Sequence, residues 1–201
     1  MNAPRNVKPR KGDQARRRVL EAVVEAVARE GLANLSVAEI GGAVGMSAGH
    51  VLYYFGTKDT LFVEALKHME AQLDVERAAI VGARSTALRR LRRYVALYLP
   101  ASTHDPRWVL WVEVWNRSLT DPDLGVIQVE LDARWQRDLA ELVAAGVAAG
   151  EFRPSDPDAA AEAIAALLDG LAVRMLTGGP TVDAAAVRRL AETSCAVVLG
   201  V

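Results

Sequence analysis

The segment from residue 36 to residue 55 contains the pattern that most constrains the fold of this chain. Ser36 lies three residues before Glu39, which is the spacing of a reciprocal capping box at a helix start. Gly45 then supplies the backbone freedom that a tight turn requires. Ser47 is placed to cap a second short helix, on which apolar residues recur at helical spacing. Two short helices joined by a glycine-containing turn form a helix-turn-helix.

The second helix of this motif has side chains that suit the major groove of DNA. In a helix-turn-helix, this helix enters the groove with its N-terminal residues leading. Ala48 and Gly49 are small enough for a close approach to base edges, and His50 can donate or accept a hydrogen bond. Tyr53 and Lys58 are spaced to meet phosphate oxygens. We therefore expect base contacts at the start of this helix and phosphate contacts beyond it.

Residues 13–66 resemble the N-terminal domain of TetR-family transcriptional regulators. The resemblance rests on the helix-turn-helix and on the sequence Leu-Tyr-Tyr-Phe-Gly-Thr-Lys-Asp-Thr-Leu-Phe at 52–62, which is close to a signature of that family. It implies a DNA-binding domain and a transcriptional regulator. The predicted DNA-binding residues are Arg16, Arg17, Ser36, Ser47, Ala48, Gly49, His50, Tyr53 and Lys58.

Charge is distributed unevenly along the chain. The first eighteen residues carry seven basic side chains and one acidic side chain, a net charge of +6, so the rest must carry −7 to reach the total of −1. A basic end on an acidic body is expected where that end meets phosphate, although a solubilising tail has the same composition. We expect a flexible basic arm at 1–12, a helix-turn-helix domain at 13–56, and an effector-binding and dimerisation domain at 57–201.

From residue 57 onward, every segment has the apolar spacing of a helix. Thr57 is placed to cap the first of these, a long helix. Asp-Pro pairs mark three later starts, because aspartate caps free N–H groups and proline fits the first helical position. The later helices are predicted at 85–101, 106–119, 122–149, 157–177 and 183–199. The chain is therefore expected to be all-α, with about nine helices.

Several classes of protein are excluded by what the sequence lacks. Cys195 is the single cysteine, which rules out an intramolecular disulfide framework and a cysteine-rich zinc site. There is no apolar run of about 18 residues and no apolar signal core, so we expect no membrane span and a cytoplasmic location. A Gly-rich phosphate loop, a nucleophile elbow and histidines at metal-ligand spacing are also missing. We expect neither an enzyme nor a cofactor.

Residues 108–117 are apolar around nearly the whole helix circumference, which predicts burial on most sides. Three tryptophans lie on one stripe of this helix and a fourth follows on the next helix. The stripe is typical either of packed core or of a small-molecule pocket, in which tryptophan faces attract cations. Asp169 has three alternative roles: ligand contact, pairing across a dimer interface, or capping a helix. The predicted ligand-binding residues are Met69, Trp108, Trp111, Glu113, Trp115, Asn116, Trp135 and Asp169.

The C-terminal part resembles the ligand-binding half of the TetR subgroup that includes the choline-responsive repressor. The resemblance rests on the sequences at 108–113, 150–152 and 169–171. It implies a homodimer joined through the last two helices. The sequence thus predicts a dimeric repressor that a small-molecule effector releases from a palindromic double-stranded DNA operator. A DNA-binding regulator without an effector and an all-α enzyme with a helix-turn-helix are the alternatives.

Overall fold

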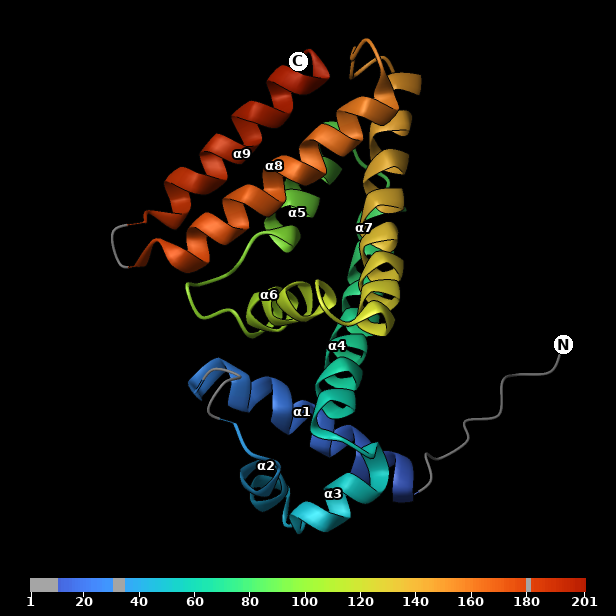
Figure 1. Cartoon of the computed structure of the whole chain (residues 1–201). Helices are drawn as coiled ribbons and strands as arrows, with labels where there is room; N and C mark the ends of the chain where they lie inside the picture. The colour runs from blue at the N-terminus through green and yellow to red at the C-terminus, as the bar shows by residue number, and fades with distance from the viewer. Residues whose placement is uncertain (1–10, 31–34, 180–181) are drawn as a thin grey trace, which may run out of the picture. The chain divides into compact units, whose positions relative to one another are not determined.

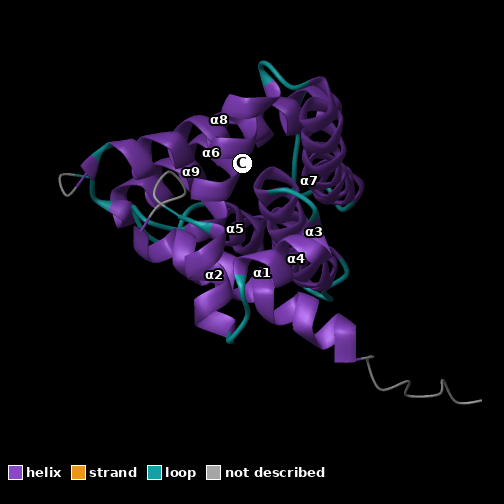
Figure 2. Ribbon diagram, turned by 60° about the horizontal axis from the view of Figure 1, so that its bottom comes forward, coloured by secondary structure: helices purple, strands orange, loops and turns teal. Residues whose placement is uncertain are grey.

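The computed structural model describes residues 11–30, 35–179 and 182–201 (Figure 1). These described residues form nine helices joined by loops and contain no strand (Figure 2), which confirms the predicted all-α fold. They divide into two compact units, residues 1–68 and 69–201, and each unit is described by itself. None of the helices in the described ranges is both long enough and apolar enough to cross a membrane.

The N-terminal unit is built from three helices and the start of a fourth. Helix α2 packs against both α1 and α3, so the three share one small core. Residues 1–10 of the predicted arm lie outside the described residues, whereas Lys11 and Gly12 begin α1. The helices are α1 (Lys11–Glu30), α2 (Val37–Val44), α3 (Ala48–Phe55) and α4 (Lys58–Val81), and the core includes Val19, Val23, Leu35, Ile40, Val51, Phe55 and Leu61.

The local signals of the helix-turn-helix form as the sequence predicts. The hydroxyl of Ser36 accepts the backbone N–H of Glu39 at 3.2 Å, and the Glu39 carboxylate accepts the Ser36 N–H at 2.8 Å. These hydrogen bonds from Ser36 lower the pKa of Glu39, because they stabilise the ionised carboxylate. Gly45 ends α2 at a φ of 72°, a left-handed conformation that favours glycine. Ser47 caps α3 by accepting the N–H of His50 at 3.2 Å.

Gly41 lies where the turn passes closest to α2. A Cβ atom at this position would be 2.6 Å from the backbone oxygen of Met46, whose N–H donates to the Gly41 oxygen at 2.8 Å. Gly41→Ala is therefore expected to destabilise the N-terminal unit by about 1–3 kcal/mol through overpacking. Gly42→Ala is the matched control, because a Cβ there meets nothing within 4 Å. Thermal unfolding of the two variants measures the difference, and equal stabilities would contradict the prediction.

The C-terminal unit consists of the rest of α4 and five further helices. The three Asp-Pro starts are confirmed, since the aspartate before each proline accepts backbone N–H groups of the following turn. Helix α7 packs against α5, α6 and α8, so it is central to this unit. The helices are α5 (Ala87–Tyr98), α6 (Pro106–Ser118), α7 (Pro122–Ala148), α8 (Pro157–Thr177) and α9 (Ala184–Leu199).

The Gly-Glu-Phe sequence at 150–152 has a structural role. Gly150 adopts a φ of 72° after the end of α7, and the ring of Phe152 is buried against Gly146. The Glu151 carboxylate accepts the N–H groups of Ala87 and Leu88 at 3.0 and 3.1 Å, and so caps α5. These two hydrogen bonds lower the pKa of Glu151.

Helices α8 and α9 lie side by side in the C-terminal unit (Figure 1). Each has an exposed row of small or apolar residues that recur every three or four positions, which puts each row on one helix face. Val197, in the α9 row, is 76% exposed. The rows consist of Ala159, Ala163, Ala166, Gly170 and Val173 on α8, and of Ala186, Leu190, Thr193 and Val197 on α9.

Candidate functional site

The predicted base-reading residues lie on the exposed side of α3. Gly49 and His50 are exposed, and Ala48 is half-buried. The His50 ring stacks on the ring of Tyr54 with centroids 5.3 Å apart. Tyr53 is 83% exposed, although it is a large aromatic residue. The exposure of Tyr53 therefore excludes a role for its ring in the hydrophobic core.

The predicted phosphate-binding cations differ in what they contact. The Arg16 guanidinium lies 2.7 Å from a Glu64 oxygen and 4.8 Å from the centroid of Phe55, so it joins α1 to α4 within the N-terminal unit. Arg17 is exposed and pairs with a glutamate one turn further along α1. The Lys58 nitrogen lies 5.4 Å from the ring centroid of Phe62. Arg16 and Arg17 thus each pair with a glutamate, and Arg17 is the more exposed of the two. The phosphate contacts of Arg16, Arg17 and Lys58 stay predictions.

Five aromatic side chains from α5, α6 and α7 come together in the C-terminal unit, and we call them the aromatic cage. Neighbouring ring centroids are 5.0 to 6.0 Å apart. The cavity among them is partly open to solvent and has a volume of about 20 Å³, close to the space of one water molecule. The cage consists of Tyr98, Trp108, Trp111, Trp115 and Trp135, and the cavity is also lined by Glu70, Leu73, Arg107 and Asp132.

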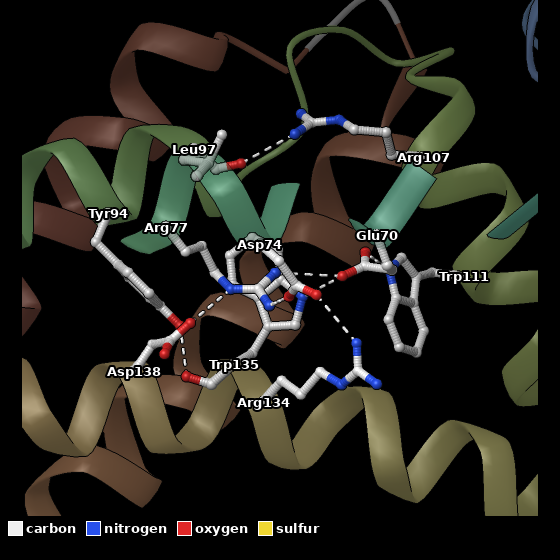
Figure 3. Close-up of polar contacts among 10 residues, drawn as sticks. All are labelled: Glu70, Asp74, Arg77, Tyr94, Leu97, Arg107, Trp111, Arg134, Trp135 and Asp138. Atoms are coloured by element: carbon white, nitrogen blue, oxygen red, sulfur yellow. Dashed lines mark hydrogen bonds and ion pairs between the residues drawn. The ribbon is translucent and has the colours of Figure 1, made fainter. Parts of the chain in front are cut away.

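Hydrogen bonds orient three of the four indole rings. Trp108 donates to the backbone oxygen of Tyr98 at 2.8 Å. Trp111 and Trp135 donate to the two different oxygens of Glu70, both at 2.8 Å (Figure 3). The cage is therefore attached to α5 through one indole and to α4 through two.

A buried ion network continues from Glu70 along α4. Arg77 is 1% exposed, and its guanidinium lies 3.3 Å from Glu70, 2.7 Å from Asp138 and in contact with Asp74 (Figure 3). The same guanidinium lies 4.0 Å from the ring centroid of Trp135, which is a cation–π geometry. The buried guanidinium of Arg77 thus pairs with three carboxylates next to the aromatic cage.

The cavity is lined by a carboxyl group without a cationic partner. Asp132 accepts a hydrogen bond from Gln128 at 2.6 Å and makes no ion pair within the described residues. Burial, together with the nearby charges of Asp169 and Glu70, raises the pKa of Asp132 to about 6, against the lowering effect of Gln128. Ionisation of Asp132 is therefore unfavourable in this cavity, and a bound cation would stabilise the ionised carboxylate.

Asp169 is hydrogen-bonded to a residue of the aromatic cage. Its carboxylate accepts the hydroxyl hydrogen of Tyr98, and burial raises the pKa of both groups. It contacts the cage through Tyr98 and does not itself line the cavity. Asp169 is thus a second half-buried carboxyl group whose charge acts on Asp132.

The structure brings together four of the eight predicted ligand-binding residues, which are the four tryptophans. Of the others, Glu113 pairs with Arg117 at 2.6 Å, Asn116 is exposed and Met69 is buried. With Asp169, these residues are not among those that line the cavity. Their roles in ligand binding stay predictions.

Glu70 and Asp132 were missed in the sequence, although one signal was present. Apolar residues on α4 recur at Leu66 and Leu73, and charged residues follow each of them by four positions, at Glu70 and Arg77. Residues four apart share a helix face, so two charged side chains on the buried stripe of α4 indicated a buried polar network. Asp132 had a weaker signal, since it precedes Trp135 by three positions on the same helix.

Two family profiles match the chain, one within each of its two units. The profile of bacterial regulatory proteins of the tetR family matches residues 19–65. The profile of the C-terminal domain of BetI-type transcriptional repressors matches residues 87–200, more than half of the chain. The chain belongs to the TetR family. As a BetI-type member it is a DNA-binding transcriptional regulator of a repressor family, and not an enzyme.

Relatives of this TetR-family regulator match it over nearly their full length. The HTH-type transcriptional regulator BetI of Burkholderia cenocepacia (strain HI2424) is 30% identical over 180 residues, which cover 88% of this chain and 90% of the relative. BetI of Ectopseudomonas mendocina (strain ymp) is 30% identical over 196 residues, covering 91% and 93%. A transcriptional regulator from Saccharomonospora viridis, solved in complex with choline, has a TM-score of 0.82 and 29% identity, covering 90% of this chain and 95% of that one.

Proposed function

We propose that this TetR-family regulator is a homodimeric repressor, released from a palindromic operator when a quaternary ammonium compound binds in the aromatic cage. The observation that carries the proposal is a cavity lined by five aromatic rings and by Asp132, a carboxyl group that makes no ion pair within the part of the chain that the structure describes. The similar regulator from Saccharomonospora viridis binds choline, which belongs to this class of ligand.

Aromatic rings and carboxylates attract the same class of guest. The faces of tryptophan and tyrosine carry negative quadrupole charge, so cages of such rings bind quaternary ammonium groups, which cannot donate hydrogen bonds. Glu70 is occupied by two indole N–H groups and by Arg77, which leaves Asp132 as the counter-charge. A ligand carboxylate would add negative charge to a cavity that already contains two carboxyl groups, so we expect a net cation as effector.

The exposed rows on α8 and α9 support a dimer. Small residues at three- and four-residue spacing allow two helix pairs to pack closely, and a second copy of the chain would cover the apolar surface. A two-fold dimer would hold two α3 helices against two half-sites, one helical turn of about 34–36 Å apart or a multiple of it. The operator is therefore expected to be palindromic.

A regulator without a small-molecule effector is the second candidate. The observation that favours it is the small cavity volume of about 20 Å³, since a packed aromatic core also leaves such gaps. The two candidates differ in whether a cation changes DNA binding, so one titration separates them.

The titration uses fluorescence anisotropy with DNA from upstream of the protein's own gene and a scrambled duplex, or an operator selected from random DNA. Tight, sequence-selective binding that weakens steeply with salt is expected of an operator-binding dimer. Choline chloride should then raise the operator Kd by about 5- to 150-fold, the usual range of allosteric coupling, while sodium chloride at equal concentration should not. Selective binding that ignores choline and its quaternary ammonium analogues would favour the second candidate.

Variants of α3 test the two kinds of DNA contact. Tyr53→Phe removes only a hydroxyl, so we expect the affinity for all DNA sequences to fall alike, by about 0.5–1.5 kcal/mol. His50→Ala should cost about 1–3 kcal/mol on the operator and less on duplexes that differ at the contacted base pair. Binding of both variants to a panel of single-base operator variants measures the difference. A uniform loss for both would mean that the assigned roles are wrong.

A further inference from the structure

We propose that Glu70 is a positioning residue that transmits the occupancy of the aromatic cage to helix α4. The inference rests on the proposed function for the identity of the guest, and it adds the residue through which that guest acts. Glu70 is itself on α4, is 1% exposed, and contacts two cage rings from two other helices.

Both oxygens of Glu70 accept hydrogen bonds from other side chains. One oxygen takes the indole N–H of Trp111 from α6, and the other takes the indole N–H of Trp135 from α7 and a hydrogen of Arg77 (Figure 3). A buried carboxylate that loses a donor is left with an uncompensated charge. When either ring moves, Glu70 must therefore move with it or lose a hydrogen bond.

The small size of the cavity favours movement of the rings on binding. The free space among the rings is only about 20 Å³, so we expect a quaternary ammonium group to displace cage rings when it binds. Movement of Trp111 or Trp135 would displace Glu70, because each of these indoles donates a hydrogen bond to its carboxylate. Trp108 instead donates to the backbone of α5. Of the three hydrogen-bonded indoles of the cage, two are thus bonded to α4 and one to α5.

Arg77 links Glu70 to two further carboxylates. Its guanidinium bridges Glu70 to Asp74 one turn further along the same helix and to Asp138 on α7. Helix α4 is continuous from Lys58 to Val81, and Lys58 is a predicted phosphate contact. A displacement of Glu70 therefore acts on the helix that also begins next to the helix-turn-helix.

Two tryptophans on the same helix supply matched variants. Trp111→Phe and Trp108→Phe each keep an aromatic face and remove one indole N–H, and both residues are 6% exposed. Only the Trp111 hydrogen bond ends on α4. Glu70→Gln is the third variant, because an amide has a single acceptor oxygen and turns N–H groups toward an indole donor.

The first measurement is the coupling factor, the operator Kd at saturating choline divided by the operator Kd without choline. We expect this ratio to fall toward 1 in Trp111→Phe and Glu70→Gln and to stay near the wild-type value in Trp108→Phe. The ratio separates transmission from plain loss of choline or DNA affinity, which choline titration by tryptophan fluorescence and operator binding record independently. Equal coupling in the two tryptophan variants would overturn the role of Glu70.

The second measurement needs no ligand. Hydrogen exchange of α4 amides should be several-fold faster in Trp111→Phe and Glu70→Gln than in Trp108→Phe. If the wild-type protein binds its operator and ignores choline and its quaternary ammonium analogues, the proposed function is wrong, and the exchange rates still decide whether Glu70 ties the cage to α4. Equal α4 exchange in all three variants would overturn the inference whatever choline does.

Discussion

Replacing Arg77 with methionine is expected to lower the free energy of unfolding of the C-terminal unit by about 3–5 kcal/mol. Methionine approximates the volume of the arginine stem but removes the buried cation shared by Glu70, Asp74 and Asp138. The 1% exposed Glu70 carboxylate would then be buried with two indole donors and no opposite charge. Removing one partner of a buried ion network is costly because the charge that remains is desolvated.

Arg134→Met is the control for this prediction. Arg134 also pairs with Asp74, at 3.0 Å, but its side chain is exposed. Exposed ion pairs contribute about 0–1 kcal/mol, so this variant should unfold close to the wild type. Urea unfolding followed by tryptophan fluorescence measures both variants. Comparable losses would mean that the network behind the cage does not stabilise the unit as its burial indicates.

Asp132→Asn is expected to weaken choline binding by roughly 10- to 100-fold at pH 8, because the variant removes the negative charge that attracts the choline cation. The substitution should also remove the pH dependence of the affinity for choline. Burial raises the pKa of Asp132 to about 6, so the carboxyl group is neutral below that pH and ionised above it. Wild-type affinity for choline should therefore be constant above about pH 7 and fall by up to about tenfold per unit below pH 6.

The groups around Asp132 set the sign of this effect. Gln128 donates to it, while Glu70 and Asp169 add negative charge that opposes its ionisation. Arg107 and Tyr98 also line or border the cavity, and Arg107 is paired with Asp105. Because the folded protein binds the Asp132 proton more tightly than the unfolded chain, this group contributes stability that is lost as the pH rises through its folded pKa.

Choline titrations from pH 5 to pH 8 on the wild type and on Asp132→Asn check the prediction. Glu113→Gln is the comparison, since Glu113 is one of the two polar residues on α6 predicted to bind ligand and the structure pairs it with Arg117. If Glu113→Gln lost affinity and Asp132→Asn did not, the counter-charge would be Glu113. A flat profile for the wild type would show that Asp132 does not titrate at the site.

Helix ends were predicted well wherever a local cap decides them. The helices after Asp105, Asp121 and Asp156 begin at the predicted proline, because the cap and its donors lie within three residues of each other. The helix predicted at 85–101 is shorter, Ala87–Tyr98. Thr86 caps its start, Leu99 is extended before Pro100, and Glu151 from a distant loop completes the N-terminal cap.

Short-range patterns in the sequence therefore determined the all-α class, the helix-turn-helix and the family, because caps, turns and helix faces involve residues a few positions apart. The tryptophan stripe was also visible, but its meaning depended on what surrounds it. The tertiary structure alone decided that Glu70 joins Trp111 and Trp135, which are 41 and 65 residues away. The tertiary structure alone also showed that Asp132 makes no ion pair with any of the residues it describes. Such partners are chosen by packing between helices, and no local pattern records that choice.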